Sequence, residues 1–459
     1  MNYRVKQNLD NRLFIVNHSD LENRIDPSPY HTERQAIINK LEKTGKLHKL
    51  KNVVNNAKSI TSEISENDIY IGLENIKSNT GEYIPTKIKA SISSAGIFKK
   101  GQILFPKLRP YLNKVYLAEF DGICSTEFHI FDSKSKLSNE FLAIYLRSDI
   151  IVKQTKHLMT GNTLPRLQTN DIDNLPVPDV SKEIQTRIIK NYNQSFKLKQ
   201  EKEKQAKELL DSIDNYLFDK LGFNVPLVDS SIENRMFQVT SKDITGSRFD
   251  AFYNQQEYYL LEEAINSAHY LNEPLRKIIT GLSNGVEIRS YSDTGFRYLR
   301  VSDLSSNGIV DKNARYVNVS EVPSKIKLDY NDFLVSRSGS LGLVSVVEDE
   351  IINSILSSHI FRVSLNTSLI NPYYLQAYLR SYVGQRLIFR NNNGGVIPEL
   401  NQTALKSIQI ILPPMELQNE IANYIIDLRD RANNLKAEAI QELKNAQQEI
   451  EKIILDNRN

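Results

Sequence analysis

The sequence predicts an α+β fold made of two similar globular domains in tandem, joined by two long antiparallel helices. Three observations predict it. The chain repeats itself once, with a period of roughly 225–235 residues, far longer than the repeat of a solenoid. Each copy contains short strand-like segments separated by Gly, Asn and Ser, together with helical segments. Each copy is followed by a long stretch without Gly or Pro, at 181–221 and at 415–459.

The repeat consists of short motifs that recur in the same order in both halves. Residues 142–148 (LAIYLRS) return as 375–381 (LQAYLRS), and 164–167 (LPRL) return as 397–400 (IPEL). Further matched pairs are 11–16 with 234–239, 50–54 with 275–279, 70–73 with 298–301, 102–107 with 332–337 and 124–127 with 356–359. The small differences in length between the copies belong in loops. We therefore expect each half to fold as its own domain.

The start of each copy carries an Arg-x-Asp motif. Arg24 and Asp26 in the first copy correspond to Arg248 and Asp250 in the second. We interpret these residues as fixing a loop and not as catalysts.

Shorter elements follow the same order in both copies. Helices are expected at 31–47 and 255–270 and again at 139–148 and 372–381. Strands are expected at 102–105 and 333–335, and each copy ends in a proline-bearing stop at 175–178 or 410–414.

The two long stretches carry the strongest helical signal. In the second stretch, apolar residues stand seven apart at 421, 428 and 435, and again at 425, 432, 439, 446 and 453. Two interleaved heptad series predict a coiled-coil-like seam. Ser181 and Gly222 are residue types that start and end helices. The expected domains are therefore 1–180 and 222–412, with long helices at 181–221 and 413–459.

Composition excludes several classes of protein. A hydrophobic fraction of 40% and a charged fraction of 25% are typical of a globular chain, and no apolar run approaches the roughly 20 residues of a membrane helix. Cys124 is the single cysteine. It cannot form an internal disulfide, so we predict a buried thiol and a cytoplasmic location. The net charge is only +3, but residues 40–114 hold fourteen Lys and Arg against six Asp and Glu, which favours a phosphate-facing patch.

One motif resembles a catalytic site. Residues 371–374 (NPYY) are similar to the [N/D]PP[Y/F] motif of adenine methyltransferases, but the second proline is missing and the repeat counterpart, 138–141, lacks the group. Asn371 as a helix N-cap with Pro372 at the first helical position explains the motif. Since the chain also has no F-x-G-x-G cofactor motif, no P-loop and no HxxxH pair, we predict neither catalytic nor metal-binding residues.

The ordered motifs resemble the specificity (S) subunits of Type I restriction–modification systems. Residues 102–114 (QILFPKLRPYLNK) and 332–340 (DFLVSRSGS) are similar to two versions of that family's central motif. Residues 413–422 (PPMELQNEIA) resemble the start of its conserved helix, and 178–185 is a weaker copy without the second proline. The resemblance covers essentially the whole chain, and the ordered set is strongly specific.

The resemblance implies a non-catalytic, sequence-specific DNA-binding subunit of a restriction system. Each globular domain would be a target-recognition domain that reads one half of a bipartite double-stranded DNA target. The helices would dock two methyltransferase (M) subunits, which bring S-adenosylmethionine, while restriction/motor (R) subunits bring ATP and Mg²⁺. The chain itself is expected to bind no cofactor. A Type IIB-like specificity subunit shares this plan and stays open, as does a helical scaffold whose domains bind proteins.

Candidate DNA contacts are polar and basic residues in loops between strands, because Arg and Lys reach phosphates and guanine edges and Asn pairs with adenine. In the first domain they are Lys87, Lys89, Lys99, Lys100, Lys107, Arg109, Tyr111, Asn113, Lys114, Asn162 and Thr163. In the second domain they are Arg289, Arg297, Arg300, Arg315, Arg337, Ser338, Ser340, Arg386, Arg390, Asn391, Asn392 and Asn393. Each of these residues taken alone is also explained as an ordinary charged or polar surface residue. The prediction therefore concerns the whole set.

Overall fold

The computed structural model describes residues 16, 21, 24–57, 59–65, 67–86, 92–226, 231, 238, 240, 248–305, 308–310, 313–320, 322 and 326–456. The predicted contacts Lys87 and Lys89 and most of the motif pair 11–16 and 234–239 lie outside these residues. The chain forms two compact units, each with its own hydrophobic core. Unit 1 comprises Met1–Lys202 and Ala437–Asn459, and unit 2 comprises Glu203–Lys436. Each long helix therefore contributes a segment to both units.

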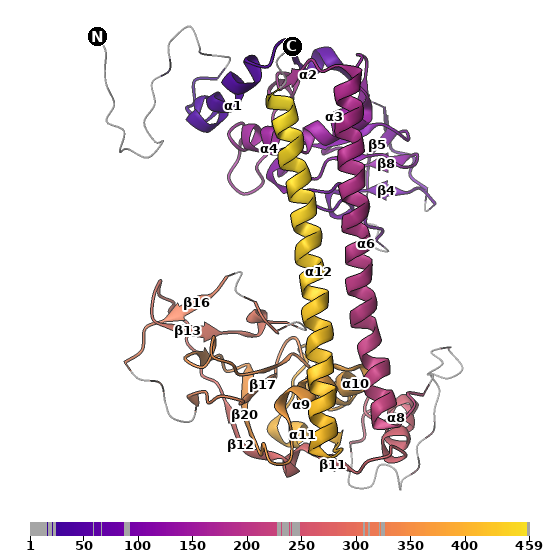
Figure 1. Cartoon of the computed structure of the whole chain (residues 1–459), viewed down its shortest axis with the longest axis vertical. Helices are drawn as coiled ribbons and strands as arrows, with labels where there is room; N and C mark the ends of the chain where they lie inside the picture. Colours follow the sequence, from indigo (N-terminus) through magenta and orange to yellow (C-terminus); the bar gives the residue numbers. More distant parts are fainter. Residues whose placement is uncertain are drawn as a thin grey trace. The chain divides into compact units, whose positions relative to one another are not determined.

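Unit 1 combines short helices with three small sheets (Figure 1). Its helical elements are η2 (Ser28–Tyr30), α1 (Thr32–Glu42), α2 (Leu50–Val53), η3 (Leu73–Asn75), η4 (Pro110–Leu112), α3 (Asn139–Leu146), α4 (Asp149–Lys156) and α5 (Thr169–Asp173). Its strands are β1 (Leu47–Lys49), β2 (Val54–Ala57), β3 (Ile60–Thr61), β4 (Tyr70–Ile71), β5 (Ala95–Phe98), β6 (Ile103–Pro106), β7 (Tyr116–Leu117), β8 (Gly122–Cys124), β9 (Phe128–Ser133) and β10 (Pro176–Pro178). The sheet orders are β2-β9-β6-β7, β3-β5-β8-β4 and β1-β10.

Unit 2 repeats this plan. Its helical elements are α8 (Gln256–Asn266), η6 (Leu275–Lys277), η7 (Val301–Asp303), α9 (Pro372–Arg380), α10 (Tyr382–Arg390) and α11 (Gln402–Ser407). Its strands are β11 (Asn272–Pro274), β12 (Ile279–Asn284), β13 (Phe296–Leu299), β14 (Leu304–Ser305), β15 (Gly308–Ile309), β16 (Arg315–Val317), β17 (Phe333–Ser336), β18 (Val344–Val346), β19 (Ile355–Leu356), β20 (Ile360–Leu365) and β21 (Gln409–Ile411). The sheet orders are β12-β20-β17-β18, β16-β13-β19, β11-β21 and β14-β15.

The two topologies match strand for strand in their central parts. The antiparallel sheet β2-β9-β6-β7 corresponds to β12-β20-β17-β18, and the two-stranded ladder β1-β10 corresponds to β11-β21. Each unit also contains one parallel pair, β4 with β8 in unit 1 and β13 with β19 in unit 2. The predicted α+β tandem repeat is confirmed.

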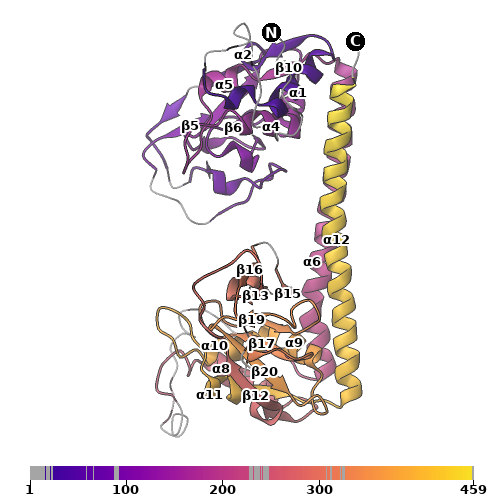
Figure 2. The same cartoon turned by 90° about the vertical axis from the view of Figure 1, so that its left-hand side faces the viewer.

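The two long helices are α6 (Lys182–Leu221) and α12 (Met415–Leu455) (Figures 1 and 2). In unit 1, Lys202 Nζ lies 2.6 Å from a carboxylate oxygen of Glu438. In unit 2, Lys220 Nζ near the end of α6 lies 2.5 Å from a carboxylate oxygen of Glu420 near the start of α12. The helices are therefore antiparallel within each unit. The heptad positions Ile421, Leu428, Ala432 and Ala439 are buried, as a coiled-coil-like seam requires.

The predicted helix ends also appear. The Asn371 side chain accepts hydrogen bonds from the backbone N–H groups of Tyr373 and Tyr374, with Pro372 at the first helical position. That capping role accounts for the methyltransferase-like motif. Gly222 has a φ of +69° directly after α6, where a left-handed residue ends the helix.

Cys124 is buried, and burial raises the pKa of its thiol to about 12.

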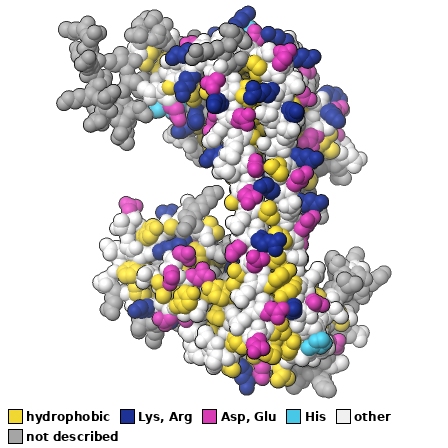
Figure 3. All heavy atoms as spheres, in the orientation of Figure 1, with side chains coloured by type: hydrophobic (Ala, Val, Ile, Leu, Met, Phe, Trp, Pro, Cys, Tyr) yellow, Lys and Arg dark blue, Asp and Glu magenta, His cyan; other side chains and the backbone are white. Residues whose placement is uncertain are grey.

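The surface view places charged and apolar side chains differently on the two units. On the face shown in Figure 3, Lys and Arg side chains are numerous over unit 1, and hydrophobic side chains gather over unit 2. Among the helices of the described residues, none combines the length and the apolar character that a bilayer-spanning helix needs.

Gly81 lies in a turn of unit 1 that tolerates no side chain. Its φ is +71°, and a Cβ there would lie 2.3 Å from the Val115 carbonyl oxygen. Gly101 also has a positive φ, +86°, but a Cβ there would meet nothing within 4 Å. We expect Gly101→Ala to cost about 1 kcal/mol from backbone strain alone. Gly81→Ala should cost about 3 kcal/mol because the overlap adds to the strain. Denaturant unfolding of both variants checks this, and equal losses would contradict the steric argument.

Candidate nucleic-acid interface

Two loops of unit 1 that carry predicted contacts lie side by side. The Arg109 backbone N–H donates to the Pro165 carbonyl at 2.8 Å, and the Leu167 N–H donates to the Lys107 carbonyl at 3.0 Å. Arg109 can turn away from β6 because it takes a left-handed conformation, with φ 47°. The segments 107–114 and 160–166 are thereby joined by main-chain bonds, although more than 40 residues separate them in sequence.

Unit 2 builds the same arrangement from equivalent residues. The Gly339 N–H donates to the Pro398 carbonyl at 3.1 Å, and the Leu400 N–H donates to the Arg337 carbonyl at 2.7 Å. Ser338 and Glu399 form a β-bridge, as Leu108 and Arg166 do in unit 1. We call these segments the paired loops: 107–114 with 160–166 in unit 1, and 337–342 with 391–399 in unit 2.

Several predicted contacts on the paired loops are open to a ligand. The exposed ones are Arg109, Tyr111, Asn162 and Thr163 in unit 1 and Ser340 and Asn393 in unit 2. Lys107 and Ser338 are half-buried. Cationic, hydroxyl and amide groups together are what contacts to phosphates and base edges require.

Four exposed predicted residues lie elsewhere. Lys99 and Lys100 are in the turn between β5 and β6, where Asp121 pairs with the Lys99 ammonium at 3.0 Å and accepts from the Lys100 N–H at 2.8 Å. The Arg289 side chain is 89% exposed beside Glu287. The Arg315 guanidinium lies 5.5 Å above the centre of the Tyr291 ring. No contact given for the described residues joins these four to the paired loops.

Other predicted cations already serve the fold. Three of them form ion pairs: Arg300 with Asp303, Arg337 with Glu399 and Arg386 with Glu257. Two donate to main-chain carbonyls: Arg297 to Val310 and Lys114 to Leu73. The hydrogen bonds that Arg300 donates to Asp303 raise the pKa of the Arg300 guanidinium. These side chains hold loops in place, and the three ion pairs partly neutralise the charges of Arg300, Arg337 and Arg386.

Two predicted contacts are wrong because the residues are buried. Asn113 is 4% exposed, and its amide donates to the Arg147 carbonyl at 2.8 Å. Arg390 is 4% exposed and pairs with Glu262 at the end of α10. In the sequence, both positions look like polar residues of a loop. In the fold, their polar groups point inward, where they form hydrogen bonds with partners inside the unit.

The expected asparagine loop is only partly a surface feature. The Asn391 amide donates to the Leu387 carbonyl at 2.9 Å, at the end of α10. The Asn392 side-chain oxygen accepts from the Gly394 and Glu399 N–H groups. Both residues are half-buried, and these side-chain groups are engaged within unit 2. Asn393 alone of the three is exposed.

The Arg-x-Asp motifs fix loops, as predicted. Arg24 forms a 2.7 Å ion pair with Asp26 and donates to the Leu158 carbonyl at 2.9 Å. Arg248 pairs with Asp250 at the same 2.7 Å and donates to the Asn392 carbonyl at 2.6 Å. Each arginine thus ties its own segment to the loop that follows a helix, α4 in unit 1 and α10 in unit 2.

The sequence analysis missed exposed apolar side chains on the same loops. Leu164 in unit 1 is 46% exposed, and Val396 and Ile397 in unit 2 are 101% and 64% exposed. Leu164 and Ile397 each directly precede a proline, at matching positions of the repeat. This match between the copies is the feature of the sequence that points to both residues. Such groups can contact thymine methyl groups in a DNA groove.

One side-chain group in the described residues has metal-ligand types at short range: His31, Glu33 and His157. The two imidazole rings stack with centroids 4.0 Å apart and an interplanar angle of 12°. His157 Nε2 lies 2.7 Å from a Glu33 oxygen, and His31 Nδ1 accepts the Glu33 N–H at 3.2 Å. Parallel stacked rings direct their nitrogen lone pairs side by side and not toward one point, so this geometry suits a cap that docks α1 on α4.

Parts of the chain are similar to known proteins. Residues 287–445 match the family described as the Type I restriction modification DNA specificity domain. The chain is 30% identical over 152 residues to the Type I restriction enzyme EcoDI specificity subunit of Escherichia coli, covering 32% of this chain and 34% of that protein. It is 27% identical over 184 residues to the putative type I restriction enzyme MjaX specificity subunit of Methanocaldococcus jannaschii, covering 38% of this chain and 43% of that protein.

A structural likeness extends over more of the chain. A solved chain from a study described as the structural basis underlying complex assembly and conformational transition of the type I R-M system has a TM-score of 0.50 and 17% identity. It covers 89% of this chain and 96% of that one. The fold is therefore shared across both units. Residues 287–445 are thus similar to the Type I restriction modification DNA specificity domain, and about a third of the chain is similar to a Type I restriction enzyme specificity subunit.

Proposed function

We propose that the chain is the specificity subunit of a Type I restriction–modification complex and that each unit reads one half of a bipartite DNA target. The observation that carries the proposal is the duplication of the paired loops. Each unit holds the same two segments together by equivalent main-chain bonds and carries exposed polar groups on them. Two such surfaces in one chain suit two separate half-sites.

The remaining roles belong to partner subunits in this proposal. The long helices dock two methyltransferase subunits, which bring S-adenosylmethionine, and restriction/motor subunits bring ATP and Mg²⁺. The chain itself binds DNA without catalysing a reaction and works in the cytoplasm. The helix-capping role of Asn371 and the absence of cofactor motifs in the sequence support a non-catalytic role.

Methylation in a reconstituted complex tests the proposal. The purified chain, a methyltransferase subunit and labelled S-adenosylmethionine should together methylate DNA at one bipartite sequence. Neither protein should do so alone. Methylation by the isolated chain, or a complex with no sequence preference, would overturn the proposal.

Arg109 provides a prediction about phosphate contact. We expect Arg109→Ala to weaken DNA binding by the complex about three- to tenfold on all sequences alike and to lower the salt slope by about 1. The reason is that the exposed guanidinium on the paired loop releases a counterion when it meets a phosphate. Binding titrations at several salt concentrations measure both quantities. Lys134→Ala, an exposed charge after β9, is the control and should leave the slope unchanged; an unchanged slope for Arg109→Ala would remove Arg109 from the interface.

A further inference from the structure

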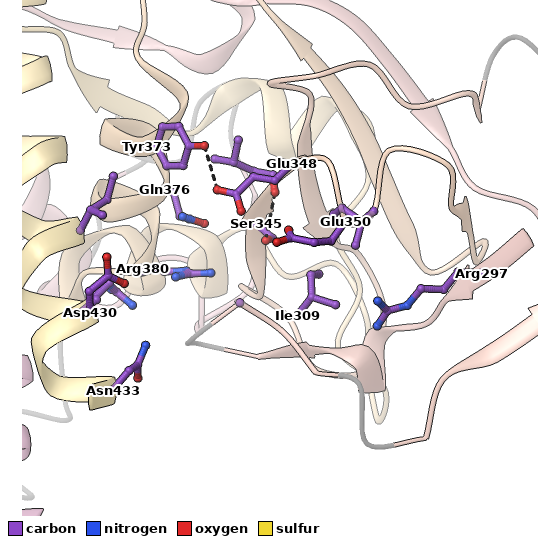
Figure 4. A pocket seen from close by; sticks show the side chains of 15 residues that line it. Arg297, Ile309, Ser345, Glu348, Glu350, Tyr373, Gln376, Arg380, Asp430 and Asn433 are labelled. Carbon is purple, nitrogen blue, oxygen red and sulfur yellow. Dashed lines mark hydrogen bonds between the residues drawn. The ribbon is translucent and has the colours of Figure 1, made fainter. Parts of the chain in front are cut away.

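Unit 2 contains a polar pocket of about 590 Å³ beside α12 (Figure 4). Its walls come from α9, β18 and the loop after it, β15, and one face of α12. Arg380 points into the space from α9, and Asp430 and Asn433 border it from α12. Tyr373 donates to Glu348 on the opposite side at 2.9 Å. The pocket lies wholly within unit 2 and outside the paired loops.

The equivalent place in unit 1 is filled by the chain's own turn. After η3, Ile76 and Tyr83 form a β-bridge, and the turn between them lies against α6. Arg147, which corresponds to Arg380 in the repeat, donates from Nη1 to the Thr80 carbonyl at 2.5 Å. Tyr192 of α6 donates to the same carbonyl at 3.3 Å.

The unit 1 turn is also held by charge and by close packing. The Glu82 carboxylate lies 2.8 Å from the buried Lys199 ammonium of α6, and that contact lowers the pKa of Glu82 against the effect of burial. Gly81 approaches Arg147 and Val115 so closely that no Cβ fits. A polypeptide turn with a main-chain carbonyl and a carboxylate is thus the native occupant of this place in unit 1.

The register of the helices confirms that the two places correspond. Gln185 near the start of α6 accepts from the Ser138 N–H at 2.9 Å, and Gln418 near the start of α12 accepts from the Asn371 N–H at 2.8 Å. Counting from these glutamines, Gln200 of α6, which contacts Glu82, matches Asn433, which lines the pocket.

The corresponding turn of unit 2 is shorter by two residues. In unit 1, six residues separate the bridged Ile76 and Tyr83. In unit 2, four residues separate the paired Leu304 and Ile309. Gly308 and Ile309, at the end of this segment, line the pocket.

The guanidinium of Arg380 faces the pocket with only part of its hydrogen-bonding capacity used. Its Nε and Nη2 both donate to the Val344 carbonyl, at 3.2 and 2.7 Å, and Nη1 has no acceptor among the described residues. Burial, together with the nearby Arg429 charge, lowers the pKa of Arg380 to about 9. A carbonyl or carboxylate oxygen brought to Nη1 would therefore be favourable.

We propose that this pocket accepts a turn of the methyltransferase subunit, which places a main-chain carbonyl on Arg380. The inference rests on the proposed function and adds a docking site that only unit 2 has. A peptide turn fits better than a small anion, because Glu348, Glu350 and Asp430 also line the pocket and would repel an isolated anion. Unit 1 supplies the same contacts from its own chain and needs no partner there.

Filling the pocket mouth tests the proposal. Asn433 lines the pocket and is exposed, so Asn433→Trp should block it without disturbing the core. Asn434→Trp is the matched control, since Asn434 is exposed on α12 but is not part of the pocket lining. The full-length chain is titrated with the methyltransferase subunit that methylates DNA with the wild-type chain. We expect at least tenfold weaker assembly for Asn433→Trp and wild-type assembly for Asn434→Trp.

A second variant guards against an indirect effect. Gln376→Trp fills the pocket from α9 and should weaken assembly in the same way. Wild-type assembly by both folded pocket variants would overturn the docking site, and so would equal losses in the Asn434→Trp control. Failure of the wild-type chain to form any DNA-methylating complex would instead overturn the proposed function, so the two failures are distinguishable.

Discussion

Replacing residues 24–178 by the corresponding domain of another specificity subunit is expected to change one half of the methylated DNA target and to leave the other half intact. The β1–β10 ladder pairs Leu47 with Pro178, so the last strand of the segment is held by a strand of the same segment. Unit 1 has a core of its own within which the foreign domain can pack. Methylome sequencing of a host that expresses the chimera with its methyltransferase measures the outcome.

The graft must keep the contacts between the domain and the helix segments of unit 1. Gln185 of α6 accepts the Ser138 N–H at 2.9 Å, and Glu451 of α12 accepts the Asp149 N–H at 2.7 Å. The reciprocal exchange of 248–411 serves as the control and should change only the other half-site. A single exchange that altered both halves would contradict independent reading by the two units.

Loss of the Arg390 side chain is expected to destabilise unit 2 by about 2–3 kcal/mol. The guanidinium is buried, pairs with Glu262, donates to the Tyr253 carbonyl at 3.1 Å and lies 4.4 Å from the centre of the Tyr253 ring. Breaking a fully buried pair costs about 3–5 kcal/mol. The cost is smaller here because the Glu262 side chain remains 42% exposed to water. Urea unfolding of Arg390→Ala measures it.

Arg289→Ala is the control for the same experiment. Its side chain is 89% exposed, so its removal should change stability by less than about 0.5 kcal/mol. If Arg390→Ala kept full stability and instead lost DNA affinity, the assignment of Arg390 to the core would be wrong.

Features set by local sequence were predictable. The long stretches without Gly or Pro predicted α6 and α12, and heptad spacing further supported α12. Asn371 with Pro372 predicted the start of α9, because helix ends depend on neighbouring residues. The internal repeat predicted two equivalent domains, and the matching sheet orders confirm it. Even the joined loops could be expected to be alike in both units, since their residues match in the repeat.

The tertiary structure alone decided which polar side chains face outward. Asn113 and Arg109 stand four residues apart in one loop, yet Asn113 is buried against Arg147 while Arg109 is exposed. Arg390 looks like any basic residue after an amphipathic helix until Glu262 is brought to it across 128 residues. The pocket beside α12 likewise brings together residues of β15, β18, α9 and α12, which lie far apart in the sequence. Such outcomes follow from contacts between segments remote in sequence, where satisfying a buried polar group outweighs local preference.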